Sequence, residues 1–247
     1  MTGESPIDRR WKMPVVPFLI GLPAVAIDAD ILSSLAEFYV PDISDVVGRM
    51  YTVHDIHSIF DPALPVVGTA ITAKCPPGDN LAVKKALTLV QPGDVLVVDA
   101  QGFTQWCLGG FQMLQRAIAE RGLRGLIVHG AYRDASEAKN AKFPIYATGT
   151  STWSGPKLGP GEINVPVCCG GVIVHPGDVV CASGDGIVVV PRSYVKQVID
   201  RLASARRAKV SQLDPAASVI AQDAALEKYF DEIKRHNLLV TLKSSFD

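Results

Sequence analysis

The sequence lacks several features that would assign it to a functional class at once. No apolar run approaches the ~20 residues of a membrane-spanning helix, and the N-terminal MTGESPIDRRWKMP has no apolar signal-peptide core. The five cysteines are an odd number, so no disulfide framework is expected and a reducing cytoplasm is the predicted location. The net charge is only −1, with Lys and Arg spread along the chain, which argues against a nucleic-acid-binding face. We therefore predict neither a membrane nor a nucleic acid as a partner.

The 247 residues, of which 48% are hydrophobic, provide ample material for a core. This length suits one large domain or two small ones. We divide the chain into an irregular, proline-interrupted arm at residues 1–27, a core at 28–192 and a helical extension at 193–247. The extension carries two amphipathic helical patterns, which favour packing either on its own domain or on a neighbouring subunit.

The core alternates predicted strands and helices, as an α/β fold does. Three apolar runs predict buried strands, at residues 66–73, 95–98 and 126–128. Between the last two, a helical pattern runs from about Phe111 to Glu120 and ends at Gly122, the usual residue for a left-handed cap. Short strands between residues 165 and 190, separated by Gly, Pro and Asp-Gly turns, indicate a second β-layer.

The stretch RGLRGLIVHGAYRDASE, residues 121–137, contains the leading candidate for a functional site. Arg133 and Asp134 follow its predicted strand, at the carboxyl end where open α/β sheets bind ligands. Arg offers a planar fork for a carboxylate or oxyanion, and Asp offers a hard oxygen ligand for a divalent cation. Together they would hold an anionic substrate and its metal, whereas the alternative is a surface ion pair in a turn.

A glycine pair, Gly109-Gly110, opens the preceding helical pattern. Amide groups at such a helix start point outward and suit a carboxylate or phosphate, whereas the alternative is simple close packing. In a right-handed β-α-β unit this helix start and the end of the next strand lie at the same edge of the sheet. We therefore expect Gly109-Gly110 and Arg133-Asp134 to converge.

Other polar residues carry weaker signals. His54-x-x-His57 has the spacing of two zinc ligands on a helix but no Cys or third His nearby, so we interpret both as solvated or core-edge side chains. Glu162 and Asn164 are either catalytic or shape their loop, and the surrounding Gly and Pro favour the structural role.

With these pieces in order, the chain resembles the RraA-like family, which includes the 4-hydroxy-4-methyl-2-oxoglutarate and 4-carboxy-4-hydroxy-2-oxoadipate aldolases. The resemblance covers roughly Ser44 to Arg192. The matching pieces are VGTAIT at 67–72, PGDVLVVD at 92–99, GLRGLIVHGAYRD at 122–134, FPI at 143–145, GPGEINVPV at 159–167, CGGV at 169–172, HPGD at 175–178 and DGIVVVP at 185–191.

The resemblance implies a layered β/β/α sandwich similar to a swivelling phosphohistidine domain, assembled as a homotrimer or homohexamer with sites between subunits. It implies a divalent metal, Mg²⁺ or Mn²⁺, and class II aldol cleavage of a 4-hydroxy-2-oxo dicarboxylic acid that releases pyruvate. Family members also decarboxylate oxaloacetate. The substrate is thus expected to be a small 2-oxo acid.

Carried over to this sequence, the resemblance assigns roles to single residues. Arg133 would be the catalytic residue that binds the carboxylate or keto oxygen of the pyruvyl part, and Asp134 would be the metal ligand. The substrate carboxylate would be held by backbone amides of Gly109, Gly110, Phe111 and Gln112.

The sequence departs from the aldolase pattern at one informative position. An acidic residue commonly follows the glycine that opens the helix in the aldolases, whereas Phe111 follows Gly110 here. The aldolases also use an acid from the adjacent subunit's C-terminal region, which Asp214, Asp223 or Glu227 would have to supply. Two alternatives therefore stay open, a non-catalytic regulatory protein of the RraA type and a lyase for another oxo acid. A methyltransferase is disfavoured because no Gly-rich nucleotide loop follows a first strand.

Overall fold

The computed structural model describes residues 18–211 and 215–236, with side chains except at 209–222. The chain divides into two compact units, Met1–Leu202 and Ala203–Asp247. Within the described residues, no helix is long and apolar enough to cross a membrane. The second unit contains the end of helix α7 (Val195–Ser211) and helix α8 (Pro215–Arg235).

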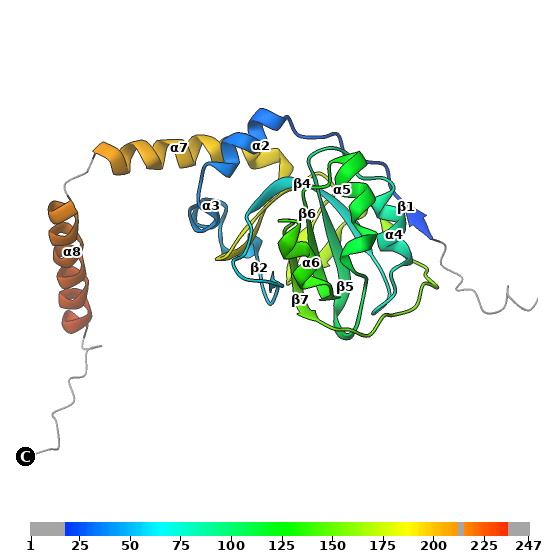
Figure 1. Ribbon diagram of the computed structural model, residues 1–247. Coiled ribbons are helices and arrows are strands. Elements are labelled where there is room, and N and C mark those ends of the chain that lie inside the picture. Colours follow the sequence, from blue (N-terminus) through cyan, green and yellow to red (C-terminus); the bar gives the residue numbers. More distant parts are fainter. Residues whose placement is uncertain (1–17, 212–214, 237–247) are drawn as a thin grey trace, which may run out of the picture. The chain divides into compact units, whose positions relative to one another are not determined.

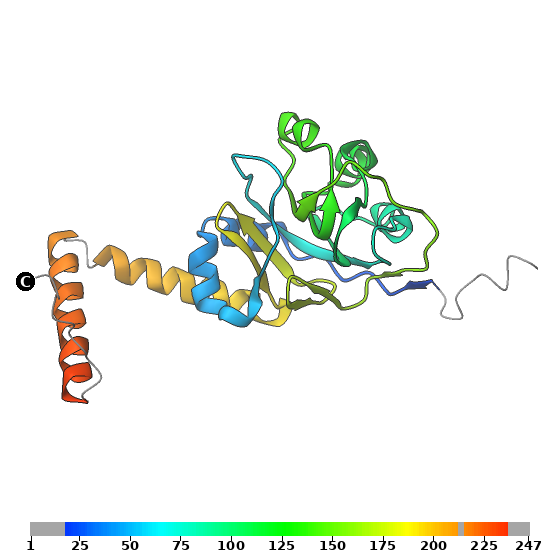
Figure 2. The same cartoon turned by 90° about the horizontal axis from the view of Figure 1, so that it is seen from below.

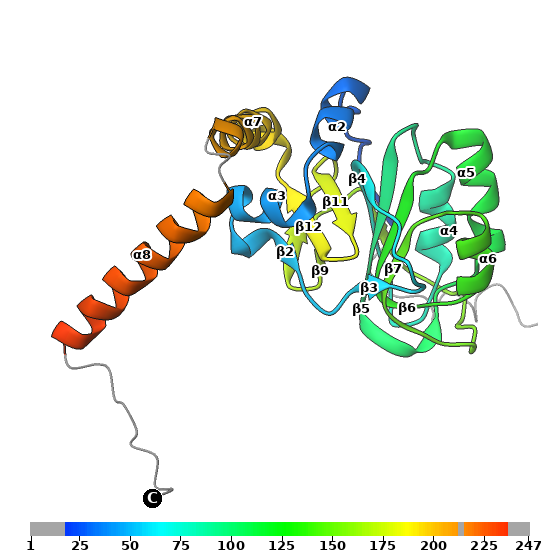
Figure 3. The same ribbon diagram turned by 60° about the vertical axis from the view of Figure 1, so that its left-hand side comes forward.

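One large mixed sheet runs through the first unit, in the order β2-β12-β11-β4-β5-β6-β7-β3 (Figures 1 and 3). Its parallel centre consists of β4 (Val66–Lys74), β5 (Asp94–Cys107), β6 (Gly125–Tyr132) and β7 (Ile145–Thr150). Antiparallel strands flank this centre, namely β2 (Thr52–Val53), β3 (His57–Ser58), β11 (Val179–Ser183) and β12 (Gly186–Val190). The short strand β8 (Glu162–Ile163) pairs with the end of β4, and β1 (Leu19–Ile20) pairs with β8.

Three short helices cover one face of the parallel strands, α4 (Leu81–Leu87), α5 (Gln115–Arg121) and α6 (Ala135–Asn140). Figure 3 shows them as one layer, and Figure 2 shows them from below on the same side of the sheet. Alternation along β5 explains this layer, because Leu96 and Val98 point into the helix-covered core while Val95 and Val97 point to the opposite face.

The opposite face is covered by a hairpin, β9 (Val167–Cys169) and β10 (Val172–Val174). The predicted second β-layer is therefore confirmed only for this hairpin, because β11 and β12 pair into the large sheet. A third apolar cluster lies on the outer face of β11 and β12, under helices α2 (Ala29–Ala36) and α3 (Val40–Val47). The first turns of α7 join this cluster through Val195, Val198 and Leu202. The predicted α/β class is therefore confirmed, and the closer comparison with a swivelling phosphohistidine domain stays a prediction.

Strand β5 differs from its prediction. The apolar run predicts a strand that ends near residue 98, but β5 continues to Cys107 with register shifts after Asp99 and after Phe103. The cause is a bulge at Gln101 and Gly102, which both adopt positive φ values of 59° and 70°. The bulge absorbs extra residues, and pairing resumes between Phe103 and Gly130.

The helix predicted from about Phe111 is also interrupted. A 3₁₀ turn (Phe111–Met113) precedes α5, because Met113 and Leu114 donate their amides to carbonyls three residues back. The predicted left-handed cap is confirmed, since Gly122 has a φ of 71°.

The turn before β5 generates a testable pH dependence. Burial raises the pKa of Asp94 from 3.8 to about 6, against the hydrogen bond that its carboxylate accepts from the Gln91 amide. The folded state thus binds more protons than the unfolded state between pH 3.8 and about 6, so this group lowers stability as the pH rises through that window.

Asp94→Asn keeps the acceptor for Gln91 and removes the buried charge. We expect urea denaturation to show that the free energy of unfolding rises by roughly 1–2 kcal/mol at neutral pH, a figure that allows for solvent screening. This gain should vanish as the pH falls towards the pKa of the unfolded state. The control is Asp185→Asn, in the exposed turn between β11 and β12, which should change stability little. A pH-independent difference between Asp94→Asn and the wild type would contradict the assignment.

Candidate active site at the end of strand β6

Arg133 and Asp134 lie where β6 meets α6, as the sequence predicted. Asp134 has a φ of 64°, a left-handed conformation that Asp tolerates better than most residues. Its Oδ2 accepts a hydrogen bond of 2.9 Å from the amide of Phe111. The Arg133 Nε is 3.9 Å from Asp134 Oδ1, and its Nη1 donates to the carbonyl of Thr152 at 3.1 Å. The two side chains therefore point into one site that also contains the start of the 3₁₀ turn.

Gly110 is in direct contact with this pair. A Cβ atom at this position would lie 1.9 Å from Asp134 Oδ2, so the close approach requires glycine. The Tyr132 hydroxyl donates to the Gly110 carbonyl at 2.9 Å and fixes the turn from the other side. The expected convergence of Gly109-Gly110 with Arg133-Asp134 is thus found in the structure.

The four residues predicted to hold a carboxylate, Gly109 to Gln112, differ in whether their backbone amides are already hydrogen-bonded. The Phe111 ring is buried against Phe143, with ring centroids 6.1 Å apart, so only its backbone faces the site. Its amide is already bonded to Asp134. In the described part of the chain, no acceptor engages the amides of Gly110 and Gln112, which leaves these two as donors for a bound anion.

Two side chains in the site were missed by the sequence analysis, Tyr132 and Cys107. Burial, and then the charge of Asp134, raise the pKa of the Tyr132 hydroxyl far above its usual value, so it stays a protonated donor. Burial also raises the pKa of Cys107, while the Arg133 charge and the Gly109 amide oppose the shift. Tyr132 directly precedes Arg133, and this adjacency was the available signal; Cys107 gave none, because only the bulge in β5 brings it alongside Ala131.

The donor set is compatible with Mg²⁺ or Mn²⁺ held by a single carboxylate. No group of three His, Cys, Asp or Glu side chains that could hold a metal occurs among the described residues. Mg²⁺ commonly binds one or two carboxylates and takes its other ligands from water and substrate. Asp134 suits this role because its carboxylate is partly exposed and the Phe111 amide orients it. His54 and His57 are both exposed and lie outside any helix.

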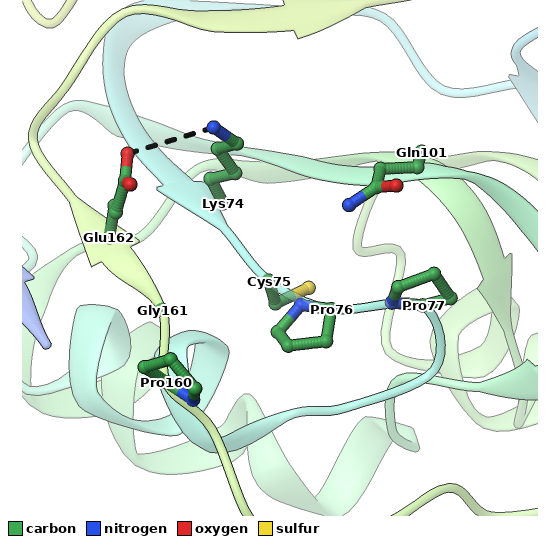
Figure 4. A pocket seen from close by; sticks show the side chains of 8 residues that line it. All are labelled: Lys74, Cys75, Pro76, Pro77, Gln101, Pro160, Gly161 and Glu162. Atoms are coloured by element: carbon green, nitrogen blue, oxygen red, sulfur yellow. Dashed lines mark ion pairs between the residues drawn. The ribbon is translucent and has the colours of Figure 1, made fainter. Parts of the chain in front are cut away.

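The other candidate acids do not complete this site within the described chain. Asp214 lies outside the described residues, and Asp223 and Glu227 belong to the second unit. Glu162 forms an ion pair with Lys74 at 3.8 Å and lines a separate hollow of about 230 Å³ (Figure 4). A second hollow of about 630 Å³ lies between α3 and α7, and neither is lined by Arg133 or Asp134.

The fold and site define a class, an α/β protein that presents an Arg-Asp pair and free backbone amides at the end of a central parallel strand. Comparison with known proteins assigns this α/β protein to a family. The RraA-like (Aldolase/RraA) family model matches residues 40–189, more than half of the chain, so this chain belongs to the RraA-like family.

Relatives within the family carry different names. A Halalkalibacterium halodurans protein provisionally named a 4-hydroxy-4-methyl-2-oxoglutarate aldolase is 39% identical over 170 residues, covering 66% of this chain and 78% of its own. Streptomyces coelicolor RraAS2, described as an unusual member of the RNase ES inhibitor RraA family, has a TM-score of 0.67 at 30% identity, covering 77% of this chain and 100% of its own. A Geobacillus kaustophilus structure named S-adenosylmethionine: 2-dimethylmenaquinone methyltransferase has a TM-score of 0.56 at 32% identity, covering 63% of this chain and 96% of its own.

The Gly110 contact generates a stability prediction. In Gly110→Ala the new methyl group would displace the Asp134 carboxylate and break its hydrogen bond to Phe111. We expect the free energy of unfolding to fall by about 1–3 kcal/mol in urea denaturation. Gly184→Ala is the matched control, because its Cβ would meet only Ala63 at an ordinary 3.8 Å. Equal stability of the two variants would show that Gly110 and Asp134 are not in contact.

Proposed function

We propose that this protein is a divalent-metal-dependent class II lyase that cleaves a 4-hydroxy-2-oxo dicarboxylic acid and releases pyruvate. The observation that carries the proposal is the convergence of Arg133, Asp134 and the Gly110–Gln112 backbone at the end of β6. The name of the Halalkalibacterium halodurans relative supports the same chemistry. On this proposal the protein works in the cytoplasm as a homotrimer or homohexamer.

Arg133 supplies fixed positive charge where negative charge develops. Retro-aldol cleavage and oxaloacetate decarboxylation both leave an enolate on a 2-oxo acid, so one site serves both reactions. The Arg133 Nε is buried 3.9 Å from Asp134 Oδ1, but the side chain is 40% exposed, so the outer part of the guanidinium is accessible to a substrate oxygen. A donor held in place before the reaction stabilises the developing charge without reorganisation.

The backbone of the 3₁₀ turn orients the substrate. The amides of Gly110 and Gln112 bind the carboxylate of the pyruvyl part, and the Tyr132 hydroxyl keeps the Gly110 peptide in place. Because glycine at 110 has no side chain, the Asp134 carboxylate packs directly against the turn, beside the amides that would bind the substrate. Held in this way, the substrate would present its keto oxygen to the Arg133 guanidinium.

Asp134 would hold the metal. The Phe111 amide orients one carboxylate oxygen and leaves the other towards the site. When bound, Mg²⁺ or Mn²⁺ supplies Lewis-acid stabilisation of the enolate. Position 111, where the aldolase pattern has an acid, is occupied by a phenylalanine whose ring is buried in the core. This chain therefore contributes fewer carboxylates to the site than the aldolase pattern does.

A regulatory role of the RraA type is the second candidate. The similarity to RraAS2, described as a member of an inhibitor family, favours it, and so does the phenylalanine at position 111. Such a role needs neither metal at Asp134 nor an oxo acid at Arg133. Metal-dependent turnover therefore separates the two candidates.

The test is pyruvate release from 4-hydroxy-4-methyl-2-oxoglutarate and from oxaloacetate, with Mg²⁺ and then with excess chelator. We expect metal-dependent pyruvate and a loss of at least about a hundredfold in kcat/KM for Asp134→Asn and for Arg133→Met. Asp134→Asn keeps an oxygen that accepts the hydrogen bond from the Phe111 amide, so a loss of activity would result from removal of the negative charge and not from unfolding.

Asp185→Asn, in an exposed turn, is the control and should retain full turnover. Unchanged metal-dependent turnover in Asp134→Asn would refute the metal-ligand assignment. If the folded, Mg²⁺-loaded wild type released no pyruvate from either acid, the proposal of a pyruvate-releasing lyase would fail, which would leave the regulatory role or a lyase for another oxo acid.

A further inference from the structure

The hollow lined by Lys74 and Glu162 lies beside the carboxyl end of β4 and the bulge in β5 at Gln101. It has a volume of about 230 Å³. Figure 4 shows the side chains around it, from Lys74, Cys75, Pro76, Pro77, Gln101, Pro160, Gly161 and Glu162. None of these residues belongs to the Arg133–Asp134 site, so ligand binding in this hollow does not depend on the proposed function.

Strand register places opposite charges side by side at its rim. Lys74 of β4 pairs with Glu162 of β8, and their side chains meet at 3.8 Å from Nζ to Oε2. Both side chains are partly exposed, 45% for Lys74 and 33% for Glu162. Exposed ion pairs of this kind contribute little to stability, so a ligand can separate the two charges at small cost.

The row of ionisable residues continues beneath the hollow. Lys74 also pairs with Asp99 of β5, and Asp99 pairs with His129 of β6. The Asp99 carboxylate is nearly buried, and it accepts hydrogen bonds from the amides of Gln101 at 2.9 Å and Cys168 at 3.4 Å. Its charge is therefore engaged within the protein and is not presented to a ligand.

The hydrogen bond that the Gln101 amide donates to Asp99 also positions Gln101. It holds the Gln101 backbone at a φ of 59°, a conformation rare for a residue with a side chain, and such conformations cluster at functional sites. Figure 4 shows the Gln101 amide reaching across the hollow towards Cys75. Burial, and then Asp79 and Asp99, raise the pKa of the Cys75 thiol to about 12, so it contributes no charge.

We propose that this hollow binds a small zwitterion, a free α-amino acid. Lys74 and Gln101 would bind the α-carboxylate and Glu162 the α-ammonium group, because a zwitterion pairs with both charges at once. A simple anion bound to Lys74 would leave the Glu162 carboxylate without a partner and next to a second negative charge. A simple cation bound to Glu162 would likewise leave the Lys74 ammonium group next to a second positive charge. A bound amino acid satisfies all three polar side chains.

The remaining wall determines which part of the amino acid faces it. The three proline rings, Pro76, Pro77 and Pro160, form an apolar surface opposite the charges (Figure 4). At ~30 Å³ per water molecule the hollow holds about eight waters, which suits a ligand of roughly ten non-hydrogen atoms. Apolar amino acids of medium size, such as proline and leucine, match both the size and the surface.

The test is titration calorimetry of the full chain with L-proline and L-leucine to millimolar concentration, repeated with N-acetyl-L-leucine and L-leucinamide. We expect saturable binding of one or both amino acids. Each derivative lacks one of the two charges, so its affinity should be lower than that of leucine by at least about tenfold, because charge-assisted hydrogen bonds are lost.

Two variants locate the site. Lys74→Met and Glu162→Gln keep the side-chain size and should each weaken binding about tenfold or more. Lys84→Met, on the exposed face of α4, is the matched control and should bind as the wild type does. Thermal unfolding of each variant checks that the fold is retained.

Three results would overturn the inference. The first is no binding of either amino acid to the folded wild type. The second is equal binding of N-acetyl-L-leucine, which would make the hollow a site for simple carboxylates. The third is equal affinity in Lys74→Met and Lys84→Met, which would place the bound amino acid elsewhere.

Discussion

The hydrogen bond between the Phe111 amide and the Asp134 carboxylate is the contact on which the candidate active site depends. It joins the start of the 3₁₀ turn to the end of β6, two segments that a whole helix and strand separate in the sequence. It is possible only because Gly110 has no side chain at this point. The same bond turns one oxygen of Asp134 towards the backbone and sets the direction of the other. Arg133, the preceding residue in the chain, lies against the same turn.

Carboxylates serve the same purpose elsewhere in the first unit, where they bind backbone amides rather than metals. Asp79 accepts hydrogen bonds from the amides of Leu81, Leu158 and Gly159, and so joins the start of α4 to a proline-rich loop. Asp178 accepts bonds from the amides of His175 and Arg192. Because each buried carboxylate uses its lone pairs on amides, the number of acidic residues says little about metal ligands. This is why the partly exposed Asp134 is the better candidate.

Strand register explains why the two polar regions of this protein are separate. Lys74, Asp99 and His129 form one row across β4, β5 and β6, and the sheet continues past them. The bulge at Gln101 then carries β5 onwards to Cys107, beside the end of β6 and the Arg133–Asp134 site. One irregular strand thus contributes to two regions, with Gln101 at the hollow beside Lys74 and Glu162 and Cys107 at the candidate active site.

The sequence by itself determined the element types and the leading site. The apolar runs of β4, β5 and β6 and the glycine at 122 are local signals, since side-chain size and glycine's freedom at positive φ act within a few residues. The adjacency of Arg133 and Asp134 after a buried strand was sufficient to predict a site at that edge. Only the tertiary structure decided the extension of β5, the buried orientation of Phe111, the Tyr132 bond to Gly110 and the pairing of Lys74 with Glu162. These depend on register and on contacts between residues far apart in the chain, which no local pattern encodes.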